Sequence, residues 1–224
     1  MKGKSSEETV KKIRTYLGLR LHSFVSSIFL LAGERDHGTI YKIMHVALDD
    51  VIPFSEYFIV PYMIWFFYVS GAVLYFFFTD KQDYFRLCTF LFIGMTISMM
   101  ICTFYPNGTD LRVEVDPNKN VFCYLVQMIH NSDTPANVFP SIHVYNSLGV
   151  HISVMNSERL RNHKWVRRSS FIIMVAICMS TVFLKQHSVV DVTGAMVLAY
   201  VMYQFVYGNA YVLSHRAERQ KVTG

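Results

Sequence analysis

Charged residues and paired cysteines are scarce in this sequence of 224 residues. Only 17% of the residues are charged, whereas 52% are hydrophobic and 15% aromatic. The four cysteines form no CxxC pair, and three of them lie inside apolar blocks, so we expect neither a disulfide framework nor a zinc site. The N-terminal arm is charged and polar and has no small-residue cleavage pattern, which argues against a removable signal peptide.

The sequence contains several long apolar blocks, and most of them hold no charged residue. These blocks are roughly 16 to 24 residues long, about the length that crosses a bilayer core. A soluble protein of this size would show shorter amphipathic stripes. We therefore predict one all-α domain, an integral membrane six-helix bundle. Its spans are Tyr16–Ala32, Tyr57–Thr79, Leu87–Phe104, Val138–Met155, Ser169–Leu184 and Val189–Leu213.

Two segments have an alternative interpretation. The first span contains Arg20 and His22, so a helix lying on the membrane surface competes with a crossing there. The segment Val121–Ile129 is apolar but too short to cross, and we interpret it as an interfacial or re-entrant helix.

The distribution of basic residues predicts the orientation. Fifteen of the 21 lie in the N-terminal arm, the loops after the second and fourth spans, and the tail, and Arg20 makes sixteen. The other side keeps five: Arg35, Lys42, Arg112, Lys119 and Lys185. The positive-inside rule then places both termini in the cytoplasm, with an arm at 1–15, a membrane domain at 16–213 and a tail at 214–224. The basic balance is explained by these loops, so we expect no nucleic-acid partner.

Polar residues that could carry chemistry begin with the segment 137–143, Asn-Val-Phe-Pro-Ser-Ile-His. Pro140 suits the first turn of a helix. Unpaired N–H groups around Ser141 would then bind phosphate, and His143 would sit one turn down, close enough to exchange a proton. A Pro-Ser-x-His sequence is also a common helix start with no catalytic role.

A second cluster is the segment 185–191, Lys-Gln-His-Ser-Val-Val-Asp. His187 and Asp191 are four residues apart, so a helix would place them on one face. A carboxylate beside an imidazole fixes its tautomer and raises its basicity, which serves a nucleophile or a general base. The alternative is an ordinary helix-surface pair.

A third cluster is the turn-rich segment 105–112, which delivers Arg112. The guanidinium fork suits phosphate oxygens, although a solvated or headgroup-contacting arginine is the simpler interpretation. The predicted topology places all three clusters at one membrane face. Charged groups that gather there are costly to keep without a use.

The order of these motifs resembles the type 2 phosphatidic acid phosphatase and vanadium haloperoxidase superfamily, and is similar also to inositol-phosphoceramide and sphingomyelin synthases. The resemblance implies a bacterial plasma-membrane enzyme with an outward-facing site that acts on a lipid phosphate without metal or other cofactor. It implies His187 as the nucleophile that forms a phosphohistidine, Asp191 as its orienting partner and His143 as the general acid. Arg112 and Ser141 match phosphate-binding positions.

The sequence departs from the family pattern at Thr181, where an arginine is usual, and at Ile142, where many members have glycine. We expect Lys185 to replace the missing positive charge. Water as acceptor would make the protein a lipid phosphatase, and an alcohol acceptor would make it a phosphotransferase. A non-catalytic lipid-binding or transport protein is the rival class, and the motifs carry no information on oligomeric state.

Overall fold

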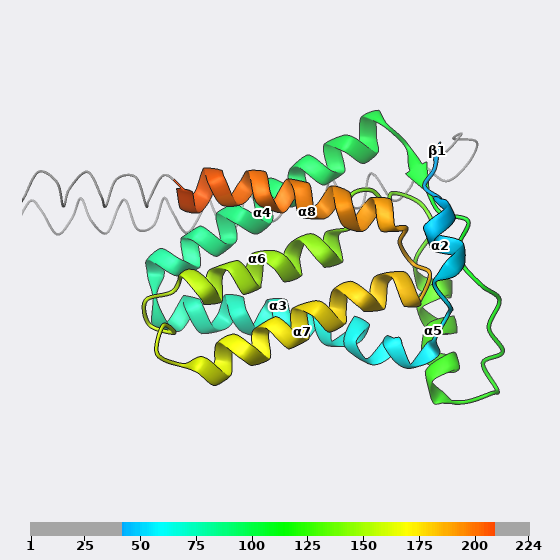
Figure 1. The fold of residues 1–224 in the computed structure, drawn as a ribbon, viewed down its shortest axis with the longest axis horizontal. Helices are drawn as coiled ribbons and strands as arrows, with labels where there is room; N and C mark the ends of the chain where they lie inside the picture. Colours follow the sequence, from blue (N-terminus) through cyan, green and yellow to red (C-terminus); the bar gives the residue numbers. More distant parts are fainter. Residues whose placement is uncertain (1–41, 209–224) are drawn as a thin grey trace, which may run out of the picture. The chain divides into compact units, whose positions relative to one another are not determined.

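The computed structural model describes residues 42–208, which form a helical bundle with one short two-stranded sheet (Figure 1). In chain order the elements are β1 (Lys42–Ile43), α2 (Ala47–Val51), the 3-10 turn η1 (Glu56–Phe58), α3 (Ile59–Thr79), α4 (Lys81–Phe104), β2 (Asn107–Gly108), α5 (Val121–Ser132), α6 (Ile142–Asn156), α7 (Lys164–Phe183), α8 (Val189–Tyr203) and the π-helical turn η2 (Gln204–Gly208). The predicted first span, the arm at 1–15, the tail at 214–224 and the last residues of the predicted sixth span lie outside the described residues.

Four helical segments are long and apolar enough to cross a membrane. They are Glu56–Thr79, Lys81–Phe104, Lys164–Phe183 and Val189–Gly208. These segments coincide with the predicted second, third, fifth and sixth spans, and they confirm the all-α class. The helices are longer than the uncharged blocks at their ends, because a helix continues through Lys81–Arg86 and Lys164–Arg168 before its apolar part begins.

The predicted fourth span is a shorter helix than expected. α6 has 15 residues, about 22 Å at 1.5 Å per residue, which falls short of a bilayer core of about 30 Å. It contacts α3, α4, α7 and α8, and it buries polar side chains such as Asn146 and Ser147. The prediction that Pro140 lies in its first turn is wrong, because Ser141 is the N-cap and Pro140 precedes it.

Small residues allow α6 and α4 to approach closely. A Cβ on Gly94 would lie 1.9 Å from the ring of Tyr145, and one on Gly149 would lie 2.6 Å from the ring of Phe90. The two rings stack with centroids 4.9 Å apart, and the Tyr145 hydroxyl donates to the Phe90 carbonyl over 2.7 Å. Such contacts between small and large residues are how helices associate where lipid removes the hydrophobic drive.

The predicted interfacial helix Val121–Ile129 forms as α5. Asn120 caps it by accepting the N–H of Cys123 over 2.8 Å. Val126 packs with Ile59 and Leu184 in a small apolar cluster beneath it.

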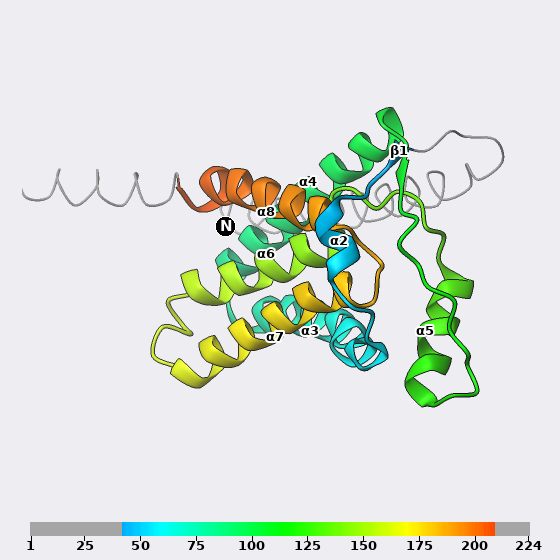
Figure 2. The same ribbon diagram turned by 45° about the vertical axis from the view of Figure 1, so that its right-hand side comes forward.

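The helix ends divide the described molecule into a histidine end and a basic end. The histidine end holds α2 and α5, the starts of α3, α6 and α8, and the ends of α4 and α7 (Figures 1 and 2). The basic end holds the turn at Asp80 and the connection 157–163. Arg159 joins these two turns by donating to the Thr79 carbonyl over 2.6 Å. All three motifs of the sequence therefore lie at one end of the bundle.

Candidate active site at the histidine end

The junction of α7 and α8 presents His187 through a tight reversal of the chain. Lys185 follows the end of α7 and adopts a left-handed conformation with φ 58°, a position that usually takes glycine. The carbonyl of Thr181 then accepts the N–H groups of both Gln186 and His187 over 3.1 Å each. This places His187 just before α8, so the prediction that His187 and Asp191 share a helical face is wrong in its geometry.

His187 and Asp191 nevertheless touch. The imidazole Nδ1 lies 3.3 Å from Oδ2 of Asp191, and that oxygen also accepts the N–H of Ser188 over 2.9 Å. Asp191 is fully buried and forms a capping box with Ser188 at the start of α8. The carboxylate therefore holds the ring through Nδ1 and leaves Nε2 of His187 for another partner.

Asp49 is a buried acid to which sequence reasoning gave no role. One of its oxygens accepts the Ser188 hydroxyl over 2.6 Å, and the other accepts the N–H of Val189 over 2.8 Å. The Lys185 ammonium donates to the backbone carbonyl of Asp49. The start of α8 is thus held by two carboxylates, one local and one from α2, 139 residues away from Ser188. The adjacent acids Asp49 and Asp50 were the only sequence signal.

His143 is the second residue of α6, not one turn into it as predicted. Its ring contacts two aromatic rings of α3. The ring centroid of His143 lies 4.5 Å from that of Tyr62 and 4.3 Å from that of Trp65. The ring centroids of His143 and His187 are 5.9 Å apart. Sequence reasoning missed the aromatic wall, because α3 is aromatic along most of its length and nothing marks these two rings as different.

Ser141 is engaged by the fold itself. Its N–H donates to the carbonyl of Asp191 over 3.2 Å, and its hydroxyl accepts the N–H of Val144 over 3.5 Å. The residue is fully buried. The prediction of an unpaired N–H at Ser141 is therefore wrong, although the same bond ties the first motif directly to the second.

Arg112 lies in the connection between β2 and α5, and most of its guanidinium is buried. It donates to the carbonyls of Asp133 and Thr134 over 2.6 and 3.3 Å, and it lies 3.6 Å from the Asp133 carboxylate. Its Nε is buried and has no hydrogen-bond partner within residues 42–208. Burial lowers the pKa of Arg112 from its ordinary value, and a nearby anion would relieve that desolvation.

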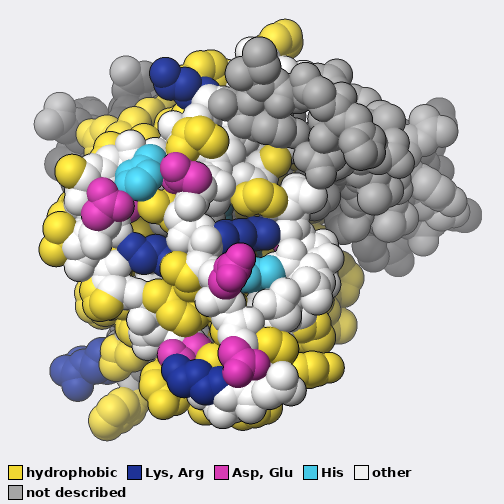
Figure 3. Space-filling view, turned by 90° about the vertical axis from the view of Figure 1, so that its right-hand side faces the viewer, with side chains coloured by type: hydrophobic (Ala, Val, Ile, Leu, Met, Phe, Trp, Pro, Cys, Tyr) yellow, Lys and Arg dark blue, Asp and Glu magenta, His cyan; other side chains and the backbone are white. Residues whose placement is uncertain are grey.

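His130 connects the arginine to the histidine junction. Its Nε2 lies 2.8 Å from the amide nitrogen of Gln186, the residue before His187. Burial and the nearby Arg112 charge lower the pKa of His130, which favours the neutral ring that can accept that N–H. Arg112 is also close enough to Tyr62, the ring beside His143, to interact with it electrostatically. The three motifs thus converge, and Figure 3 shows basic, acidic and histidine side chains gathered on this end of the molecule.

An apolar groove of about 600 Å³ runs between α4 and α8 beside this cluster. Its lining includes Phe139 and Pro140, which precede Ser141, and Val189 and Val190, which follow Ser188. Gly194 brings α8 against Phe139, because a Cβ there would lie 2.4 Å from the ring. Within residues 42–208, no group of three or more His, Cys, Asp or Glu side chains is arranged to hold a metal ion.

No protein family, curated protein or solved structure matches this chain. The family resemblance therefore rests on the three motifs themselves, and the roles of their residues rest on the geometry described above.

Proposed function

We propose that this protein is an integral membrane phosphatase that hydrolyses phosphate esters of lipids through a phosphohistidine on His187. The observation that carries the proposal is the pair of imidazoles 5.9 Å apart, one of them oriented by a buried carboxylate. A nucleophile, its orienting group and a second proton-transfer group close to one another form the constellation required for covalent catalysis on a bound phosphate ester.

In the proposed reaction, Nε2 of His187 attacks phosphorus and the ester oxygen leaves with a proton from His143. His143 then takes a proton from water, and that water attacks the phosphohistidine to release phosphate and restore His187. Arg112 supports the reaction as a cation near the site, and its buried Nε has no hydrogen-bond partner within residues 42–208, so it is available to an anionic substrate. Among the described residues, the Lys185 ammonium donates one N–H to the Asp49 carbonyl, which leaves two N–H groups for a phosphate oxygen.

The groove between α4 and α8 supports a lipid substrate. It begins at residues next to both histidine motifs and continues along apolar side chains such as Val197 and Val201, which are exposed. An acyl or isoprenoid chain in this groove would hold the phosphate end of the lipid near His187. We further propose that both termini are cytoplasmic and that this end of the bundle faces outward in a bacterial plasma membrane.

The test is phosphate release by the purified full chain from a panel of lipid monophosphates and lipid pyrophosphates. We expect His187→Ala to lower turnover by at least about 10³-fold, because nothing else replaces the nucleophile. His163→Ala is the matched control, since this exposed histidine lies at the basic end and should leave turnover unchanged. Parent-like turnover by His187→Ala would refute the histidine nucleophile.

Vanadate offers an independent readout, because it adopts the five-coordinate geometry expected during attack and should bind more tightly than phosphate. We expect inhibition of the parent enzyme and no vanadate binding by His187→Ala. Asp191→Asn should retain vanadate binding but lose most turnover, since the amide orients the ring without stabilising its positive charge.

A further inference from the structure

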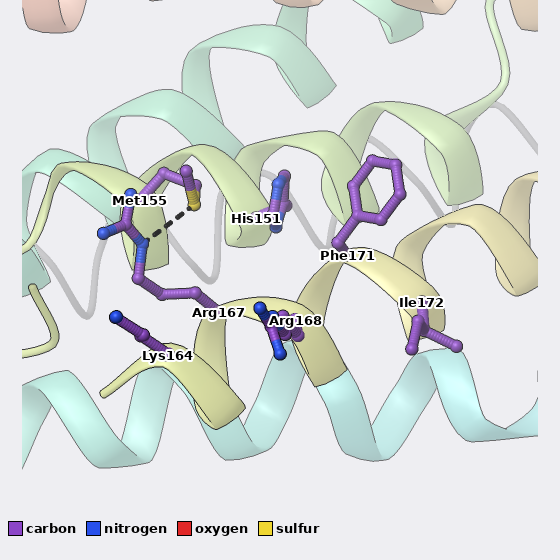
Figure 4. A pocket seen from close by; sticks show the side chains of 7 residues that line it. All are labelled: His151, Met155, Lys164, Arg167, Arg168, Phe171 and Ile172. Atoms are coloured by element: carbon purple, nitrogen blue, oxygen red, sulfur yellow. Dashed lines mark hydrogen bonds between the residues drawn. The ribbon is translucent and has the colours of Figure 1, made fainter. Parts of the chain in front are cut away.

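A second cavity, at the basic end, lies between α6 and α7 and has a volume of about 460 Å³. Lys164, Arg167 and Arg168 line it from the first turns of α7 (Figure 4). Within residues 42–208 none of these three side chains forms an ion pair with an acid, and no carboxylate lines the cavity. The cavity therefore concentrates three uncompensated positive charges.

The cavity changes from cationic to apolar along the axis of α7. Lys164, Arg168 and Ile172 are spaced four residues apart and so lie on one helical face, with Phe171 beside them. The cations occupy the first turns, and the apolar side chains occupy the next turn, toward the middle of a helix of membrane length. Phe171 and Ile172 are 52% and 66% exposed, so they are open to lipid.

The opposite wall of the cavity is built and held in place. Met155 and His151 of α6 face α7, and Nε of Arg167 donates to the Met155 sulfur over 3.2 Å (Figure 4). Arg167 also donates to the Arg161 carbonyl over 3.2 Å. His151 is tied to the buried Ser170 hydroxyl over 3.1 Å.

We infer that this cavity binds an anionic phospholipid of the leaflet that contacts the basic end, with the headgroup phosphate on Lys164 and Arg168 and an acyl chain along Phe171 and Ile172. A free anion would use only the cationic turns, whereas a phospholipid matches the order of charge and apolar surface along the helix. Basic pockets between membrane helices are suited to acidic headgroups. This inference is independent of the proposed catalysis, because it concerns the other end of the bundle.

Native mass spectrometry of the full chain in detergent tests the inference, with phosphatidylglycerol and phosphatidylcholine added at equal concentrations. We expect phosphatidylglycerol adducts to dominate. Lys164→Gln with Arg168→Gln should reduce phosphatidylglycerol binding at least roughly ten-fold, since each basic residue contributes to headgroup attraction. The matched control, Lys81→Gln with Arg161→Gln, removes two exposed charges from the same end but outside the cavity, and should bind like the parent.

Competition with soluble glycerol 3-phosphate distinguishes binding of the headgroup alone from binding of the whole lipid. Glycerol 3-phosphate should not displace phosphatidylglycerol at an equal concentration, because it lacks the chain. Equal binding of the two lipids, an equal loss in the control variant, or displacement by glycerol 3-phosphate would each overturn the inference. The lipid preference and the competition are measured on the parent protein, so they decide the question even if the double variant does not fold.

Discussion

The two ends of the described bundle differ in whether several of their charged side chains are exposed or buried. At the basic end, residues such as Arg159, Arg161 and Lys164 stay exposed on turns and on the first turns of helices. At the histidine end, Asp49, Asp191, Lys185 and His187 are all buried. The connections differ as well, since a single residue, Asp80, separates α3 from α4 at the basic end, whereas residues 109–120 join β2 to α5 at the histidine end.

The difference shows where folding removes charged groups from water. Exposed cations keep their hydration, whereas a buried charge loses it unless hydrogen bonds or an opposite charge compensate. Asp49 and Asp191 each accept a backbone N–H at the start of α8, and the Lys185 ammonium donates to the Asp49 carbonyl. Such an arrangement destabilises a protein when it is incomplete, and buried titratable groups cluster at functional sites, which supports the proposal that the site lies at this end.

The largest expected contrast between the ends is their accessibility from outside the cell. In a variant lacking the four native cysteines, Asn118→Cys at the histidine end should react with a membrane-impermeant maleimide in intact cells. Asn162→Cys at the basic end should react only after the membrane is permeabilised, because the positive-inside rule places that end in the cytoplasm. Both residues are exposed, so the reverse labelling pattern would invert the orientation and put the proposed active site inside.

The next largest effect is expected for Lys185, a buried cation at the histidine end. Lys185→Met should lower turnover by roughly 100-fold if the ammonium stabilises the transition state, by analogy with loss of an oxyanion donor. Lys185→Arg should recover part of the activity. Lys119→Met is the control, since that lysine lies at the same end but is paired with Glu56 over 2.7 Å.

A structural role for Lys185 makes a different prediction, because its ammonium also holds the carbonyl of Asp49 in α2. In that case Lys185→Met would lower the melting temperature while vanadate affinity stays at the parent value. Thr181→Arg is not a suitable rescue, since Thr181 is fully buried and its hydroxyl donates to the Cys178 carbonyl. An arginine there would have to displace packed neighbours.

The membrane-length helices were predictable because the signal is local. Uncharged apolar blocks must form helices to satisfy their backbone in lipid, and basic flanks separate the two ends whatever the packing. The contact of His187 with Asp191 was also predicted, although a capping box, and not a shared helical face, produces it.

The rest depends on partners far away in the sequence. Asp49 acts on Ser188 across 139 residues, and the N–H of Ser141 acts on the carbonyl of Asp191. Neither of these contacts produces a periodic pattern in the sequence. The start of α6 was misplaced because Pro140 suits a first turn but also suits the position before a cap, and only the bond between Ser141 and Val144 distinguishes the two.

Substitutions in the helix packing between the two ends should have smaller effects than substitutions in the proposed site. Gly94→Ala places a methyl group 1.9 Å from the ring of Tyr145, which is buried and held by its hydroxyl bond to Phe90, so the ring cannot move aside. We expect a loss of about 1–3 kcal/mol in the free energy of unfolding, the usual effect of overpacking. Gly71→Ala, in α3, is the control, because its added methyl meets nothing within 4 Å. Equal melting temperatures for the two variants would contradict this close approach of α4 and α6.

The smallest expected effect concerns a histidine at the same end as the site but outside it. Nδ1 and Nε2 of His45 lie 2.9 and 2.8 Å from Asp110 and Asp50, so the ring joins the connection before α5 to α2. The hydrogen bond to Asp50, followed by that to Asp110, raises the pKa of His45 above 6.5. A raised pKa in the folded state means that the protonated ring stabilises the fold. That contribution is fully present below pH 6.5 and is lost as the pH rises through the raised value.

Melting temperatures of the parent and of His45→Gln between pH 5 and 8.5 measure this effect. The melting temperature of the parent should exceed that of the variant by most at pH 5, where the His45 ring is protonated, and the gap should narrow toward pH 8.5. Because the ring is partly exposed, water and salt screen the pair, and the gap should also shrink in high salt. A gap that widens with rising pH would mean that the neutral ring is the stabilising form, and the sign of the proposed linkage would be wrong.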